Sequence, residues 1–140
     1  MLAQIAIGTV IISATIFIEV LCFQWAIRVM KGYGHRYLAS SHTLHQVIVL
    51  TGTTLWLLFA LSLSIWIWAF AFWGLGAFAS LEQAVYFSMV AFTTLGFGDV
   101  VLPQNWRLLS GIIAANGLLL FGLNTAFLLE ILHRIFLRTK

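Results

Sequence analysis

The chain has 140 residues, of which 62% are hydrophobic and only 8% are charged. A soluble domain carries roughly a quarter of charged residues, so this chain cannot cover a water-facing globule and a membrane protein is expected. The formal net charge of +3 is too small to indicate nucleic-acid binding. The single cysteine, Cys22, cannot form an intrachain disulfide.

A first apolar stretch runs from about Leu2 to Val29. A helix that crosses a bilayer needs about 20 mostly apolar residues. A signal peptide is the alternative, but the stretch lacks a basic start, is too long and has no small-residue cleavage site after it. We therefore assign residues 1–31 to an N-terminal transmembrane helix. Glu19 lies in the middle of this helix, where a carboxyl group indicates either a functional site or a contact that fixes helix packing, and we favour packing.

Residues 32–45 form a predicted cytoplasmic link, and a second apolar stretch follows from about Val47 to Trp73. The link contains His35, His42 and His45. Because they lack the cysteine or carboxylate neighbours and the spacing of a metal site, we interpret the first two as solvated side chains.

A shorter apolar stretch, Leu81 to Phe92, has only about a dozen residues and is too short to span a bilayer. Its length suits a re-entrant helix that is shielded from lipid by protein. Ser80 is a predicted N-cap for this helix, with Gln83 at the capping-box position.

The short helix leads into the sequence TTLGFGD, residues 93–99. Its carbonyl groups have no helix to satisfy them, and at membrane depth such groups are tolerated only within protein or along a watery path. Gly96 and Gly98 allow alternate residues to take left-handed backbone conformations, so that neighbouring carbonyls face the same way. A row of carbonyls on an axis is a site for a dehydrated monovalent cation. The Thr94 hydroxyl can add a further oxygen, and Leu95 and Phe97 are expected to point away from the axis.

A third spanning stretch runs from about Leu108 to Phe136. Six basic residues lie at the ends of the first and third stretches or shortly after them: Arg28, Lys31, Arg36, Arg134, Arg138 and Lys140. Only Arg107 lies elsewhere. The positive-inside rule places these ends in the cytoplasm, with the N-terminus outside. Four tryptophans near the predicted outer surface are expected to be interface anchors: Trp66, Trp68, Trp73 and Trp106.

The TTLGFGD sequence resembles the potassium-channel signature T-V-G-Y-G-D. The resemblance extends from about Leu44 to Leu129 and includes FGLNTA, residues 121–126, which is similar to the inner helix of a small proton-activated bacterial potassium channel. The motif also resembles the second pore loop of two-pore-domain potassium channels. The first helix lies outside this family plan. We predict an all-α membrane protein with three transmembrane helices, a re-entrant pore helix and a selectivity filter, assembled as a tetramer.

The resemblance implies a pore module over residues 46–137. Its parts are an outer helix (46–74), a pore helix (80–93), a filter (94–99) and an inner helix (107–137). It also implies roles for single residues. Potassium ions would bind the carbonyls of Thr94, Leu95, Gly96 and Phe97, with Gly98 at the outer mouth. Asp99, Tyr86, Phe87 and Val90 would support the filter, Leu118, Phe121 and Thr125 would line a cavity, and Gly117 would be the hinge.

Two departures from the family pattern alter the filter's support. Phe97 lacks the hydroxyl that tyrosine provides there, and the pore-helix aromatic positions hold Tyr86 and Phe87 in place of two tryptophans. Val90 occupies a position that carries glutamate in the bacterial channel, so Asp99 must find another partner or water. Asn116 and Asn124 flank Gly117, and for Asn124 the helical phase indicates an interhelical hydrogen bond.

A gating role is predicted for His45, which resembles the place of the bacterial channel's proton-sensing histidine. The acidic partners expected there are replaced by Phe136 and Arg138. Glu130 and His133 share a helical face, and His133 continues the cavity stripe toward the axis. Histidine changes charge near pH 6.5. We therefore predict more opening as cytoplasmic pH falls through about 6 to 7.

These observations predict a potassium-selective channel and not an enzyme, with no cofactor and with K⁺ as the permeant ligand. We expect a homotetramer in the lipid bilayer of the cell membrane, which in a bacterium is the inner membrane, with no nucleic-acid partner. A weakly selective monovalent cation channel is one alternative. A non-conducting membrane subunit of a larger assembly is the other.

Overall fold

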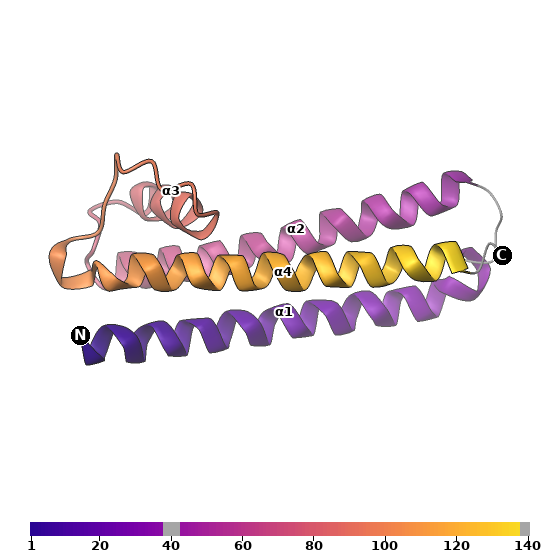
Figure 1. Ribbon diagram of the computed structural model, residues 1–140, viewed down its shortest axis with the longest axis horizontal. Helices are drawn as coiled ribbons and strands as arrows, with labels where there is room; N and C mark the ends of the chain where they lie inside the picture. The colour runs from indigo at the N-terminus through magenta and orange to yellow at the C-terminus, as the bar shows by residue number, and fades with distance from the viewer. Residues whose placement is uncertain (38–42, 138–140) are drawn as a thin grey trace.

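The computed structural model describes residues 1–37 and 43–137, without the side chains of residues 31, 33–37, 43, 45 and 134–137. This part of the chain is helical and contains no strand. Its elements are α1 (Leu2–Tyr37), α2 (Thr43–Gly74), α3 (Leu81–Phe92), a short 3₁₀ helix η1 (Gln104–Trp106) and α4 (Leu108–Leu137) (Figure 1). Three helices are long and apolar enough to cross a membrane, through Leu2–Met30, Gln46–Gly74 and Leu108–His133. The predicted all-α membrane protein is confirmed at this level.

The long helices extend further into the link than the sequence suggested. α1 continues through Tyr37, and α2 begins at Thr43, before the predicted start of the outer helix at residue 46. No proline lies between residues 31 and 43, so nothing in this stretch removes a backbone N–H donor or forces a break.

The helices form three layers. α2 and α4 lie side by side in the middle, α1 contacts both on one side, and α3 contacts both on the other (Figure 1). α1 and α4 run in the same direction, and α3 lies at the end where both of them begin. This arrangement places the segment after α3 against the first half of α4.

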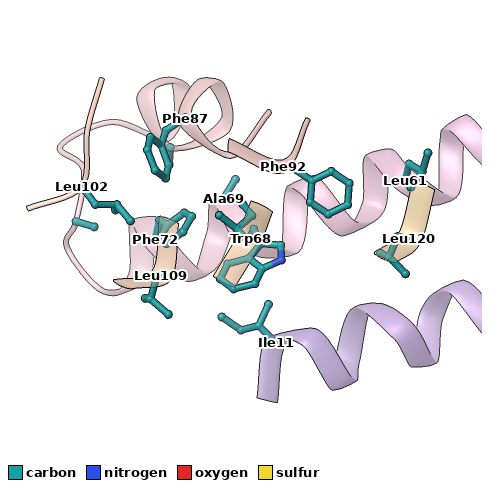
Figure 2. Packing of buried hydrophobic residues seen from close by; sticks show 13 residues of the cluster. Ile11, Leu61, Trp68, Ala69, Phe72, Phe87, Phe92, Leu102, Leu109 and Leu120 are labelled. Carbon is teal, nitrogen blue, oxygen red and sulfur yellow. The ribbon is translucent and has the colours of Figure 1, made fainter. Parts of the chain in front are cut away.

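The core lies where α2, α3 and α4 meet, and it includes four aromatic side chains, those of Trp68, Phe72, Phe87 and Phe92 (Figure 2). Phe72 packs edge-on against Phe87 of α3, with ring centroids 5.4 Å apart. Trp68 is fully buried one turn before Phe72, so its prediction as an interface anchor is wrong. The sequence shows that this end of α2 is apolar, but the face that packs on α3 and α4 is decided by tertiary contacts. Trp66 and Trp73 are exposed, as an anchor requires.

α3 begins where the sequence indicated. The Ser80 side chain accepts a hydrogen bond from the Gln83 backbone N–H at 3.2 Å, which is one half of the predicted capping box. At 1.5 Å per residue the 12 residues of α3 extend only about 18 Å. A helix of that length enters a membrane without crossing it.

Candidate functional site

Residues 94–99, called here the TLGFGD segment, are exposed and follow closely on Phe92, the buried last residue of α3. Phe92 ends α3 and approaches Gly117 so closely that a Cβ built on the glycine would lie 1.9 Å from the Phe92 carbonyl oxygen. Gly117 is nine residues into α4 from Leu108, which is about 14 Å along the helix axis. The TLGFGD segment therefore begins beside the first half of α4.

Left-handed backbone conformations alternate along the TLGFGD segment. Gly96 and Gly98 have φ angles of 58° and 78°, and Thr94 has a φ of 62°, whereas Leu95 and Phe97 are not in this region. The predicted alternation at the two glycines is confirmed, and Thr94 extends it by one step. Such alternation lets successive carbonyl groups face one direction. For a β-branched residue, a positive φ is an outlier of the kind that clusters at functional sites.

The amide groups at the start of the segment are bonded back to α3. Thr94 N–H donates to the Ala91 carbonyl at 3.0 Å, and Leu95 and Gly96 N–H both donate to the Val90 carbonyl, at 3.0 and 3.4 Å. In the described residues no donor is bonded to the carbonyls of residues 94–97. The Thr93 hydroxyl is also turned back, donating to the Met89 carbonyl at 2.7 Å. Val90 therefore holds the segment through its backbone, a role that its side-chain type could not reveal.

Asp99 has a partner in α3. The Tyr86 hydroxyl donates a hydrogen bond to Asp99 Oδ2 at 2.6 Å. This bond lowers the pKa of Asp99. Partial burial raises that pKa, and hydrogen bonds from backbone N–H groups lower it further. The same bond raises the pKa of Tyr86. The other partner that Asp99 was expected to find is thus the Tyr86 phenol. Phe87, predicted to support the segment, is buried against Phe72 and Phe78.

Two apolar side chains of the segment have little cover within one chain. Leu95 is 62% exposed and Phe97 is 67% exposed. Exposed side chains of this size, next to a carbonyl row, are a surface that a second copy of the chain can cover.

The predicted cavity residues lie on one exposed face of α4. Leu118, Phe121 and Thr125 are all exposed, and the Phe121 ring lies 5.9 Å from the Phe92 ring. Leu129 and His133 continue the same exposed face. α4 is continuous through Gly117, which contacts the end of α3.

The three predicted gating residues are described unequally. Glu130 and His133 are exposed and lie about one turn apart on α4. The His45 side chain lies outside the described residues, as do those of Phe136 and Arg138, and His35 and His42 fall there too. The gating role of His45 stays a prediction.

The opposite face of α4 is joined to α1 by two buried polar pairs. Asn124 donates to the Glu19 carboxyl at 2.6 Å, and Asn116 donates to the Thr15 hydroxyl at 2.9 Å. The predicted interhelical hydrogen bond of Asn124 is confirmed. Its partner is Glu19, which supports the packing role that the sequence analysis favoured for Glu19. The sequence shows polar residues within both apolar stretches, which indicates contacts between the two helices. It does not indicate which of these residues pair.

Three features fit the class of membrane channels. They are the short α3, the TLGFGD segment with its alternating backbone, and the long helices that flank them. A family model described as ion channel matches residues 51–134, which is more than half of the chain. The chain therefore belongs to this ion-channel family, and the match confirms the resemblance to channel pore modules. A search of curated proteins found no match, and neither did a search of solved structures.

Proposed function

We propose that the protein is a potassium-selective channel in which the TLGFGD segments of four copies surround one conduction path. The observation that carries the proposal is the alternation of left-handed residues at Thr94, Gly96 and Gly98. The segment begins against Gly117 of α4, and we place it near mid-membrane. Carbonyls turned one way at that depth can replace the hydration shell of a monovalent cation. Thr94, Leu95, Gly96 and Phe97 provide these carbonyls, and Gly98 forms the outer mouth.

Two features support assembly into a ring. One chain supplies a single row of carbonyls, and a closed ring requires copies related by rotation. Leu95, Phe97 and the exposed face of α4 are the apolar surfaces that neighbouring copies and a water-filled cavity would use. In a tetramer the C-terminal ends of four α3 helices, each with partial negative charge, converge below the segment and favour a cation.

The test is cation flux through the purified protein, reconstituted alone in liposomes. We expect K⁺ and Rb⁺ to pass far better than Na⁺. Comparable Na⁺ and K⁺ flux would instead support the weakly selective channel, which the missing hydroxyl of Phe97 favours because it leaves the segment with fewer supporting bonds. Absence of any flux, with the tetramer intact, would support the non-conducting subunit.

We further propose that protonation near the cytoplasmic end of α4 opens the pore. The supporting observation is that His133 continues the exposed face of Leu118, Phe121 and Thr125, so four copies would place four imidazoles around the axis. Positive charges on neighbouring helices repel one another and separate the helix ends. Open probability should rise as cytoplasmic pH falls, and a variant with His45→Ala and His133→Ala should lose this response. An unchanged pH response in that variant rules the proposal out.

A further inference from the structure

Glu19 lies fully buried within the membrane-spanning part of α1. Among the described residues, only one of its two carboxyl oxygens has a partner. Oε1 accepts a hydrogen bond from Asn124 Nδ2 at 2.6 Å. Oε2 and the Asn124 side-chain oxygen, Oδ1, are both buried, and neither has a partner among the described residues. Two buried acceptors without donors, on two side chains already joined by a bond, require an explanation.

A proton supplies the missing donor. Both N–H groups of the Asn124 amide are used, since Nδ2 also donates to the Leu120 carbonyl at 2.8 Å. An ionised Glu19 would offer only acceptors, whereas a neutral carboxylic acid offers one O–H donor. That O–H on Oε2, if it donated to Asn124 Oδ1, would satisfy both atoms at once. It also removes a charge that would be costly at membrane depth.

We propose that Glu19 is a neutral carboxylic acid held by two hydrogen bonds to the Asn124 amide, and that this acid–amide pair positions the conducting helix α4. The second part rests on the proposed channel function. Within that frame Glu19 and Asn124 are positioning residues that do not touch the permeant ion.

The placement of the pair supports the positioning role. α1 lies on the side of the α2–α4 layer opposite to α3 (Figure 1). Asn124 is buried toward α1, whereas its neighbour Thr125 is exposed on the proposed cavity face. A rotation of α4 about its axis, or a bend below Gly117, would pull Asn124 away from Glu19. α1 therefore stabilises one orientation of the cavity face.

The protonation state of Glu19 is tested by infrared spectroscopy at neutral pH. The sample is the full-length reconstituted protein with isotope-labelled glutamate. The difference between wild type and Glu19→Gln should contain the C=O band of a protonated carboxyl. The matched control is Glu82→Gln, which removes an exposed carboxyl from α3 and should show only the bands of an ionised carboxylate. Carboxylate bands in the Glu19→Gln difference would overturn the proposal.

The positioning role is tested by single-channel recording. Glu19→Gln keeps the pairing because an amide N–H replaces the acid O–H, so its open probability should equal that of wild type. Glu19→Leu and Asn124→Leu should each shift the open–closed equilibrium about eightfold, the size expected for the loss of two interhelical hydrogen bonds. The double variant should shift it no further. Additive shifts, or a Glu19→Gln variant as altered as Glu19→Leu, would overturn the role.

The two tests separate this inference from the channel proposal. The infrared result does not need conduction, and tetramer melting temperature gives a second measure of coupling between the two positions. A neutral Glu19 with coupled melting but no flux supports the acid–amide pair and removes the channel function. Selective flux with an ionised Glu19 removes the pair and leaves the channel.

Discussion

At the scale of single residues, Thr94 shows that the TLGFGD segment is held in an unfavourable backbone conformation. A β-branched residue with φ of 62° is strained by roughly 1–3 kcal/mol. The hydrogen bonds from Thr94, Leu95 and Gly96 to the end of α3 offset this strain. The chain thus maintains a left-handed backbone at Thr94 that an unconstrained loop would not adopt.

Gly96→Ala should abolish potassium flux. A Cβ at Gly96 meets nothing within 4 Å in the single chain, so the effect comes from its φ of 58°, at which a side chain costs about 1–2 kcal/mol. The matched control is Gly76→Ala, because Gly76 has a φ of 66°, equally open surroundings and a position outside the segment. It should lower stability by a similar amount and leave K⁺ flux per tetramer unchanged. Equal loss of flux in both variants would show that the carbonyl row has no special role.

Tyr86→Phe should make conduction more sensitive to acid on the outer side. The Tyr86 hydroxyl lowers the pKa of Asp99. The bond's contribution to stability is therefore complete above a pH of about 3.9, the ordinary pKa of an aspartate. It is lost as pH falls through the lowered pKa of Asp99. The raised pKa of Tyr86 keeps the phenol protonated to above its ordinary value of about 10. At constant cytoplasmic pH, wild-type flux should therefore be flat from an external pH of about 5 to 9.

In Tyr86→Phe the pKa of Asp99 should return toward its ordinary value, and flux should begin to fall at a higher external pH. Liposome flux measured against external pH compares the two proteins, and Asp99→Asn provides the control. The double variant Tyr86→Phe, Asp99→Asn should behave as Asp99→Asn alone. A titration profile identical to wild type would show that the hydrogen bond does not support the segment.

At the scale of elements, the crossing of α3 and α4 sets the depth of the TLGFGD segment. The contact depends on Gly117, where the backbone of Phe92 occupies the space of a side chain. The proposed hinge is thus also the point of closest approach. A movement of α4 there would be transmitted directly to the last residue of α3.

Gly117→Ala should separate α3 from α4 and destabilise the protein by at least about 1–3 kcal/mol. The added Cβ would lie 1.9 Å from a backbone oxygen, which cannot move aside as a flexible side chain could. Gly122→Ala is the control on the same helix, because nothing lies within 4 Å of its Cβ position. Thermal unfolding in detergent and K⁺ flux should both fall for Gly117→Ala and stay near wild type for Gly122→Ala. Equal stability of the two variants would contradict the close contact.

The sequence was most informative where local chemistry sets an element's ends. The cap at Ser80 and the glycines after Phe92 gave the limits of α3, and Gly96 and Gly98 gave the backbone alternation. It was least informative about which apolar or polar face meets which neighbour. Trp68 was misplaced at the lipid interface, and the bond from Tyr86 to Asp99 depends on how α3 tilts, which periodicity does not encode.

At the scale of the whole molecule, we predict that the two ends of the chain lie on opposite sides of the membrane, because the described residues contain three helices long and apolar enough to cross it. A tag before Met1 should be reachable from outside the cell, and one after Lys140 only from the cytoplasm. Protease accessibility of the two tags in intact cells and in inverted vesicles provides the measurement. If both tags are cut from the same side, α1 does not span. Native mass spectrometry of the untagged protein should give four chains per assembly.

The bond between Glu19 and Asn124 also has a consequence for biosynthesis, because the two residues are 105 positions apart in the chain. A ribosome adds about 5–20 residues per second, so α1 is made roughly 5 to 20 seconds before α4 can offer its amide. During that interval the nascent helix has a carboxyl group and no partner. Retention of α1 by the translocon or by an insertase over those seconds would spare it from facing lipid alone. The arrival of α4 would then release α1 from the translocon or the insertase.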